Sequence, residues 1–173
     1  VLSPFKFPAS LSARHEEELR KRAISPEFAL ASGVRSAADN ELRDLNFQAS
    51  LPRDERSKGL QGICFPYVDL ELNAEAAWRI KPDSTFTMSD GSHPKYLSRI
   101  GDKPRAYYPH TTTLELLSDP KANVVITEGE YKALAIAEAL QKAEQKRRFA
   151  VIGLQGVNGG WHRDKKIVPT ADG

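Results

Sequence analysis

The clearest pattern of hydrophobic and polar positions lies in the last third of the chain. Residues 124–127 are apolar or β-branched, a Glu-Gly pair follows at 128–129, and a helical pattern continues from residue 130. A second apolar run occupies residues 149–154. Near-continuous apolar runs are typical of parallel strands covered by helices, and glycine permits the sharp turn between strand and helix. The pattern therefore predicts a strand–helix–strand unit with a right-handed crossover.

Glu128 ends the first of these strands. Ligands of open α/β sheets bind beyond the carboxyl ends of the strands, so Glu128 is the main candidate site residue. Glu130 falls in the first helical turn, where the helix dipole favours an acidic side chain. Lys132, further into the helix, either meets a phosphate or stays solvated. Glu130 and Lys132 are supporting candidates.

Three short helices are expected near the amino terminus. A helix from Ser12 places acidic residues early and basic residues late, as its dipole favours. Ser25 and Pro26 are typical of a second helix start, which Gly33 ends, and Ser36 is expected to begin a third with Asp39 as the acidic partner of a capping box. The glycine between two helices leaves two interpretations open, a helix-turn-helix and a packing appendage.

The middle of the chain is strand-rich. Residues 60–70 and 76–81 predict a hairpin, with further extended pieces at 94–99 and 105–108. The charged, turn-rich residues 50–59 form a loop in this interpretation, and a boundary is expected there. The predicted fold class is α/β, or α+β overall, divided into a helical appendage with an amino-terminal arm, a mostly antiparallel strand region and a strand–helix–strand half-domain, at residues 1–49, 50–120 and 121–173.

Composition narrows the class of protein. Of the 173 residues, 40% are hydrophobic and 28% are charged, which is ordinary for a globular chain. No apolar run approaches the ~20 residues that cross a bilayer, so a cytoplasmic protein without a membrane partner is expected. Cys64 is the only cysteine, which excludes an intrachain disulfide, and the four histidines are too scattered for a structural zinc site.

A net charge of +2 does not by itself indicate nucleic-acid binding, but the distribution of charge is informative. Basic and aromatic residues alternate between positions 78 and 108. Aromatic rings stack on bases and cations pair with phosphates, so the mixture suits a groove for single-stranded DNA. The alternative is a solvated sheet face with the rings buried beneath it. The basic residues are Arg79, Lys81, Lys95, Arg99, Lys103 and Arg105, and the aromatic ones are Trp78, Tyr96, Tyr107 and Tyr108.

A glycine-rich stretch follows the second apolar run, with Gly156, Gly159 and Gly160 as its candidate residues. Backbone N–H groups of such a loop can approach a phosphate closely. The stretch matches neither the P-loop nor the dinucleotide-binding fingerprint. A simple connection is therefore the preferred interpretation.

Several of these motifs together resemble a known family. Val-Ile-Thr-Glu-Gly-Glu at 125–130, followed by a strand and Gly-Leu-Gln-Gly-Val at 153–157, is similar to the opening half of a Toprim domain, the metal-dependent fold of bacterial-type primases, topoisomerases and some nucleases. In particular, the chain resembles the Toprim-like domain of unknown function in plasmid and phage replication proteins. The upstream motifs that support this resemblance occur in order at residues 62–70, 77–83, 95–97 and 105–109.

The resemblance implies a primase-like nucleotidyltransferase of DNA replication, which binds single-stranded DNA and nucleotides and works with Mg²⁺ or Mn²⁺. A helicase domain or subunit as a further partner stays open. Glu128 takes the catalytic and metal-binding role by this analogy. Two alternatives are a noncatalytic DNA-binding or assembly domain with a degenerate Toprim fold, and a Toprim nuclease or topoisomerase-like enzyme.

One departure from the family affects the expected activity. Toprim proteins add an Asp-x-Asp pair from a later strand to the first glutamate, and the sequence contains no Asp-x-Asp. An isolated carboxylate is a poor Mg²⁺ site, because this ion usually takes one or two carboxylates together with phosphates and water. We therefore expect a fragment or a degenerate member that holds half of a site and is inactive alone.

The parallel sheet is also expected to be incompletely covered. The predicted unit offers one crossover helix, at residues 130–145, for strands that need cover on both faces. We expect either an exposed apolar edge or protection by the amino-terminal arm and helices.

Overall fold

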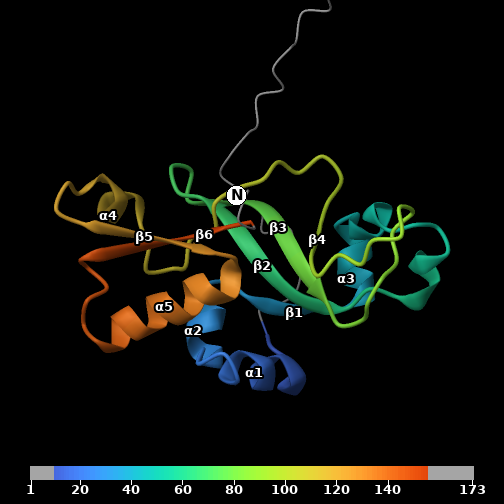
Figure 1. Cartoon of the computed structure of the whole chain (residues 1–173), viewed down its shortest axis with the longest axis horizontal. Helices are drawn as coiled ribbons and strands as arrows, with labels where there is room; N and C mark the ends of the chain where they lie inside the picture. Colours follow the sequence, from blue (N-terminus) through green and yellow to red (C-terminus); the bar gives the residue numbers. More distant parts are fainter. Residues whose placement is uncertain (1–9, 156–173) are drawn as a thin grey trace, which may run out of the picture.

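The computed structural model describes residues 10–155 and contains two sheets (Figure 1). The larger is antiparallel with strand order β1-β2-β3-β4, and the smaller pairs β5 with β6 in parallel. This mixture of helices with both kinds of sheet confirms the α/β class. The strands are β1 (Arg35–Ala37), β2 (Gly62–Asp69), β3 (Ala74–Pro82), β4 (Leu97–Ser98), β5 (Asn123–Glu128) and β6 (Phe149–Leu154). The helices are α1 (Ala13–Arg20), α2 (Pro26–Ala31), α3 (Asp39–Asp44), α4 (Leu114–Ser118) and α5 (Glu130–Lys142), with 3₁₀ turns at Phe47–Ser50 and Glu55–Lys58.

The first two helices begin where the sequence predicts. The Ser12 hydroxyl accepts a hydrogen bond from the backbone N–H of His15 at 3.3 Å, and the Ser25 hydroxyl accepts one from Phe28 at 3.2 Å. Each bond satisfies an amide that has no partner inside the helix. Gly33 follows α2 with a φ of +76°, which glycine adopts without strain.

The third predicted helix is present as α3, but its predicted start at Ser36 is wrong. Ser36 lies in β1 and pairs with Ile63, and α3 begins three residues later. The capping role belongs to Glu41, whose carboxylate accepts a hydrogen bond from the Ala38 N–H at 2.9 Å. Because a strand separates α2 from α3, the helix-turn-helix interpretation is also wrong.

The predicted hairpin of β2 and β3 is confirmed, and it separates two hydrophobic cores. Side chains alternate between the faces of a strand, so neighbouring residues of β2 enter different cores. Ile63, Phe65 and Tyr67 pack with residues of α1, α2 and α5 in the first core. Cys64 joins Trp78 from β3 and residues 37–60 in the second. Figure 1 shows α1, α2 and α5 on one side of the hairpin and α3 toward the other end of the molecule.

The predicted strand–helix–strand unit is confirmed as β5-α5-β6. Its register places Asn123 opposite Phe149 and Glu128 opposite Leu154. The expected strand at 105–108 is reduced to one bridge, in which Tyr107 and Gly153 exchange both backbone hydrogen bonds at 2.8 and 2.9 Å. This bridge attaches the loop before α4 to the free side of β6.

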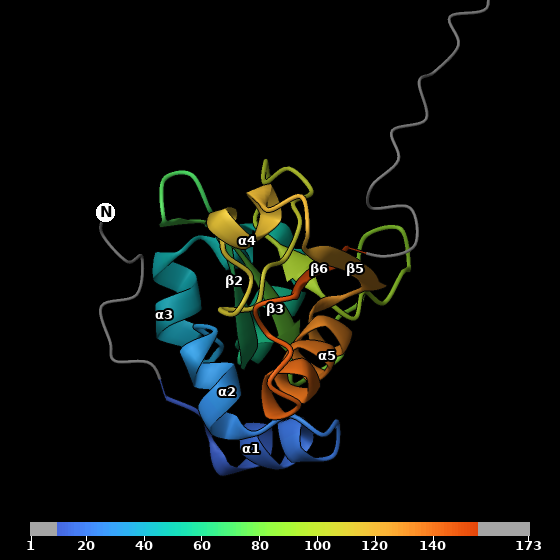
Figure 2. The same ribbon diagram turned by 90° about the vertical axis from the view of Figure 1, so that its left-hand side faces the viewer.

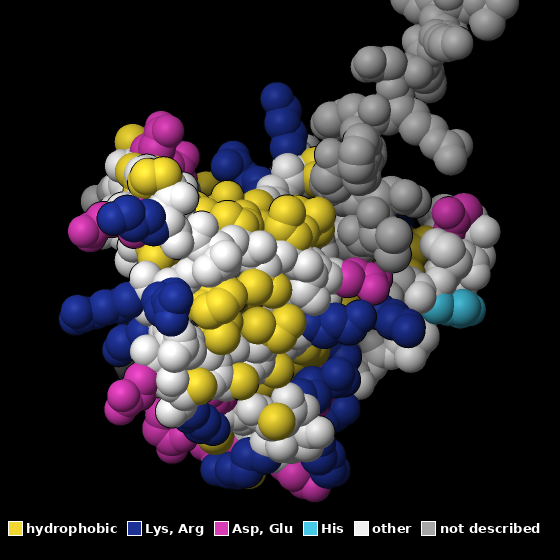
Figure 3. Space-filling view, turned by 60° about the vertical axis from the view of Figure 1, so that its left-hand side comes forward, with side chains coloured by type: hydrophobic (Ala, Val, Ile, Leu, Met, Phe, Trp, Pro, Cys, Tyr) yellow, Lys and Arg dark blue, Asp and Glu magenta, His cyan; other side chains and the backbone are white. Residues whose placement is uncertain are grey.

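Strand β5 has an exposed apolar side. Val124 is 51% exposed and Ile126 is 63% exposed, whereas Ala150 and Val151 of β6 are buried. Helices α1 and α2 lie beside α5 in both ribbon views, rather than over β5 (Figure 2). Hydrophobic side chains gather in patches on the face of the molecule drawn in Figure 3, with Lys and Arg around them. The described residues show the exposed apolar edge, and the amino-terminal arm of the other expected outcome lies outside them.

The predicted three-part division stays a prediction. The first core takes Leu19 and Phe28 from the first segment, Phe65 from the second, and Tyr131 and Leu134 from the third. Within residues 10–155, no helix is long and apolar enough to cross a membrane.

Candidate functional site

Glu128 lies at the surface where β5 ends. Its side chain is 49% exposed, and Lys132 Nζ lies 3.4 Å from its carboxylate. The next residue, Gly129, has φ +74° and ψ 169°, a conformation essentially restricted to glycine. The Gly129 N–H donates to the Leu154 carbonyl at 2.7 Å, which fixes this turn to the end of β6. The structure thus brings Glu128 and Lys132 together, as a carboxylate and a cation at the end of a strand.

Glu130 has a different environment, because its side chain is buried and faces the hairpin. It is 1% exposed. One carboxylate oxygen accepts hydrogen bonds from the Tyr67 hydroxyl at 2.5 Å and from Arg79 Nη1 at 2.9 Å. The other oxygen is buried and has no hydrogen-bond partner among the described residues. These contacts hold the first turn of α5 against β2 and β3.

Arg79 is fixed on both sides of its guanidinium. The group lies 4.4 Å from the centre of the Tyr96 ring, a cation–π contact, while it donates to Glu130. Burial alone disfavours the charged guanidinium, but Glu130 and Tyr67 together outweigh it and raise the pKa of Arg79. Burial also raises the pKa of Tyr96 to about 12. Arg79 is therefore a partner of Glu130 rather than a free surface cation.

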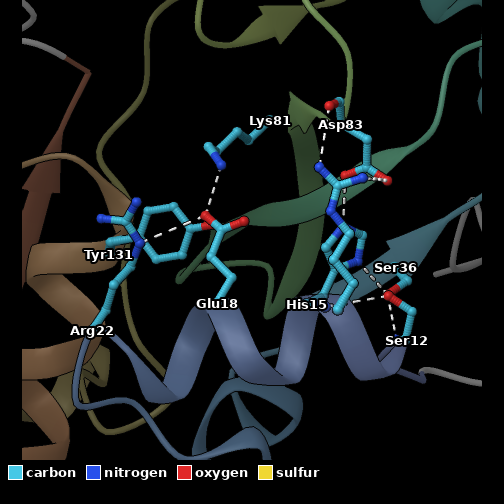
Figure 4. Close-up of polar contacts among 9 residues, drawn as sticks. Ser12, His15, Glu18, Arg22, Ser36, Lys81, Asp83 and Tyr131 are labelled. Carbon is cyan, nitrogen blue, oxygen red and sulfur yellow. Dashed lines mark hydrogen bonds and ion pairs between the residues drawn. The ribbon is translucent and has the colours of Figure 1, made fainter.

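Lys81 is similarly engaged, by a polar face of α1 (Figure 4). Lys81 Nζ donates to Glu18 at 2.7 Å, and the Tyr131 hydroxyl donates to the same carboxylate oxygen at 2.7 Å. Although burial opposes it, these two hydrogen bonds keep the pKa of Glu18 below its ordinary value. Arg22 lies over the Tyr131 ring at 4.3 Å. Glu18 of α1 thus neutralises Lys81, which the sequence pattern assigns to the groove for single-stranded DNA.

The same helix is anchored at its start by His15, which is buried. Its Nδ1 lies 2.6 Å from the Ser36 hydroxyl and its Nε2 lies 2.8 Å from an Asp83 carboxylate oxygen. Asp83 also lies 3.5 Å from Arg14 Nη1. These contacts link α1 to β1 and to the residue that follows β3.

The other basic candidates differ in their exposure and in whether a carboxylate pairs with them. Arg99 makes a two-point contact with Asp102, at 3.1 and 3.2 Å. Lys95, Lys103 and Arg105 are exposed, and no carboxylate pairs with them in the described part of the chain. These three are the candidate residues whose charge is free to meet a phosphate.

The aromatic candidates also divide. Trp78 is 2% exposed, lies in the second core on the opposite face of β3 from Arg79, and contacts Arg35 through its ring. Tyr107 is fully buried in the first core. Tyr96 and Tyr108 are partly exposed. Only these last two rings are at the surface, where a base can stack on them.

The Tyr107–Gly153 bridge brings one free cation toward Glu128. In an antiparallel pairing, the residue two before Tyr107 runs beside the residue two after Gly153, which is just beyond the end of β6. Glu128 ends β5 on the other side of β6. Two strand spacings amount to ~10 Å, so the backbone of Arg105 runs at the same sheet end as Glu128. Lys95 lines a hollow with Lys81 and Asp83, and its neighbour Tyr96 packs on Arg79.

The residues described here do not complete a Mg²⁺ site. No group of three or more His, Cys, Asp or Glu side chains within residues 10–155 is arranged to hold a metal ion. Glu130 faces Arg79, which leaves Glu128 as a single carboxylate beside Lys132. Gly156, Gly159 and Gly160 lie outside the described residues.

Comparison with known proteins supports the architecture. No protein-family model and no curated protein sequence matches the chain. A solved structure of the Aquifex aeolicus primase, comprising its zinc-binding and RNA polymerase domains, superposes with a TM-score of 0.52 and 17% identity, over 84% of this chain and 37% of that one. The fold is primase-like.

A structure of the DnaG catalytic core is also similar, with a TM-score of 0.47 and 14% identity over 84% of this chain and 48% of that chain. The chain spans less than half the length of either solved structure.

Sequence reasoning missed the partners that occupy Arg79 and Lys81. Glu130 lies 51 residues from Arg79 and Glu18 lies 63 residues from Lys81, and no local motif links either pair. The one available signal was the alternation of β3, which places Arg79 and Lys81 on one face and Trp78 on the other.

Proposed function

We propose that this chain is part of a primase-like, Toprim-type replication protein of the cytoplasm, which binds single-stranded DNA at the sheet end that carries Glu128. In the complete protein, Glu128 would contribute to Mg²⁺- or Mn²⁺-dependent nucleotidyl transfer. The observation that carries the proposal is the position of Glu128 at the end of β5, before Gly129 and α5, within a primase-like fold.

The contacts of Glu130 support this assignment. The carboxylate lies two residues after Glu128 and is tied to Tyr67 and Arg79 of the antiparallel sheet. Catalytic groups need supporting residues that hold them within a fraction of an ångström of a productive position. Glu130 is therefore a positioning residue, which fixes the turn from which Glu128 projects.

The exposed cations support the template-binding part of the proposal. Lys95 directly precedes the partly exposed Tyr96, and Lys103 and Arg105 precede the residue that bridges to β6. A single strand bound there would place its phosphates on these cations and a base on a ring. A helicase domain or subunit acting with this site is a further part of the proposal, as is nucleotide binding.

A noncatalytic DNA-binding domain is the second candidate. The Lys132 ammonium lies 3.4 Å from the Glu128 carboxylate, so the two charges partly neutralise each other. If Glu128 only stabilises the start of α5, it needs no second carboxylate beside it, unlike a residue that binds a metal ion. This candidate predicts the same DNA binding without a contribution of Glu128 to catalysis.

Primer synthesis by the natural full-length protein separates the two candidates. Glu128→Gln keeps the size of the side chain and removes its charge, and we expect it to abolish synthesis while the protein still binds single-stranded DNA. Glu27→Gln, the same change at an exposed carboxylate of α2, is the matched control and should retain synthesis. Wild-type primer yield from Glu128→Gln would remove Glu128 from the site and favour the noncatalytic candidate.

A further inference from the structure

A second candidate binding site lies at the opposite end of β5 and β6. A hollow of about 710 Å³ is formed where α4, the end of α5 and the loop before β6 meet, and His110, Lys146 and Arg147 line it. These loops enter the amino ends of the two strands, whereas Glu128 lies at the carboxyl end. A six-residue strand separates the two places by roughly 16 Å. The volume is in the range of small-molecule sites.

His110 is held in a defined orientation at this hollow. Its Nδ1 lies 2.9 Å from the hydroxyl of the buried Ser32, and its own backbone N–H donates to that hydroxyl at 3.3 Å. The imidazole ring packs against Phe28 with the ring centres 4.6 Å apart. Among residues 10–155 nothing contacts Nε2 by a hydrogen bond, so this nitrogen is the one available to a ligand.

The two cations of the hollow have no carboxylate partner among the described residues. Lys142, the last residue of α5, is by contrast paired with Glu138 at 2.8 Å. Burial lowers the pKa of His110, and the nearby Lys146 ammonium lowers it further. A ligand with negative charge would be attracted to the Lys146 and Arg147 cations.

The hollow also contains carboxylates, which restrict the kind of ligand. Glu115 and Asp119 contribute to its lining, with the Thr111 and Thr113 side chains. Two cations and two carboxylates together do not suit a bare polyanion. They suit a compound that carries a phosphate group at one end and hydroxyl groups at the other, because carboxylates accept hydrogen bonds from hydroxyls.

We propose that this hollow binds a small phosphate ester, with His110, Lys146 and Arg147 around the phosphate and Glu115 and Asp119 facing the hydroxyl groups of its sugar. A mononucleotide and a sugar phosphate share this chemistry. The proposal does not depend on the function of Glu128, because the two sites lie at opposite ends of the strands.

The test is an NMR titration of the His110 ring, which reports on this site alone. The probes are adenosine monophosphate, ribose 5-phosphate and adenosine, and His110→Gln assigns the resonance among the four histidines. We expect the two phosphate esters to shift the His110 signal in a saturable way, and adenosine to leave it unchanged. A response to both esters shows that a sugar phosphate is sufficient, and a response to the nucleotide alone shows that the base is also bound.

Variants distinguish a defined binding site from nonspecific electrostatic attraction. Lys146→Gln should weaken binding about tenfold, the effect expected from losing one charge-assisted hydrogen bond. Lys142→Gln, which removes an already paired cation nearby, and Glu128→Gln should leave the affinity unchanged. An absent shift at millimolar ester, an equal shift with adenosine, or equal affinity in Lys146→Gln would each overturn the proposal. An extended DNA strand that binds here more tightly than the mononucleotide would also overturn it.

Discussion

Arg79 and Glu130 form the contact on which the geometry of the proposed site most depends. Glu130 is almost fully buried, and Arg79 supplies its compensating charge. Arg79→Ala should destabilise the protein by about 2–3 kcal/mol, because it leaves the buried Glu130 carboxylate without its cation. The cost is limited because Arg79 itself is only partly buried, so solvent screens part of the interaction. Arg99→Ala, which breaks a surface pair with Asp102, should cost about 0–1 kcal/mol. Urea unfolding measures both variants, and equal costs would contradict the structural role of Arg79.

Asp39 makes stability depend on pH. The Leu60 N–H donates to its carboxylate at 2.7 Å and lowers its pKa, against the effect of burial and with further help from Arg43 and Gln48. A carboxyl group whose pKa is lower in the folded protein stabilises the fold at a pH above its pKa in the unfolded chain, which is about 4. This stabilisation is lost as the pH falls through the pKa of the folded state. We expect the urea concentration at the unfolding midpoint to decrease as the pH falls below about 4. Asp39→Asn should make this decrease smaller. Glu27→Gln, at an exposed carboxylate, is the control, and an unchanged profile in Asp39→Asn would exclude this contribution.

At the scale of elements, the close approach of β6 to the start of α5 depends on Gly153. A Cβ at this position would lie 2.8 Å from the Gly129 carbonyl oxygen and 3.1 Å from the Ala133 Cβ. Gly153→Ala should therefore cost about 1–3 kcal/mol by overpacking and displace the turn after Glu128. A Cβ at Gly101 meets nothing within 4 Å, so Gly101→Ala tests backbone strain alone and should cost less. Thermal unfolding compares the two, and a larger cost at Gly101 would contradict the close packing.

Elements with local signals could be predicted from the sequence. The start of α2 is determined by neighbouring residues, because the Ser25 hydroxyl caps the Phe28 N–H and Pro26 is the first helical residue. The apolar runs of β5 and β6 identify their strands without knowledge of the rest of the fold. Strand β1 could not be found this way, because its three residues become a strand by pairing with residues 62–64. The site follows the same rule. Glu128 follows from its place after β5, whereas the partner of Arg79 lies 51 residues away in another element.

At the scale of the whole molecule, the apolar side of β5 is the surface most prone to self-association. Val124 and Ile126 are more than half exposed on a strand whose outer edge pairs with no other described residue. Such edges associate unless a charge blocks them. Sedimentation should show self-association that increases with concentration, and Ile126→Lys should remove it. Leu72→Lys places the same charge at an exposed residue of the hairpin and should not, so equal effects of the two variants would contradict this assignment.

The salt dependence of binding to single-stranded DNA tests the central claim most directly. We predict that replacing Lys95, Lys103 and Arg105 with alanine reduces the slope of log affinity against log salt by about 2, since each phosphate contact on a single strand contributes about 0.7. Replacing the exposed Arg20, Lys21 and Arg43, each of which is paired with a carboxylate of its own helix, should leave the slope near its wild-type value. An unchanged slope in the first triple variant, or an equal decrease in both, would contradict a DNA-binding site beside Glu128.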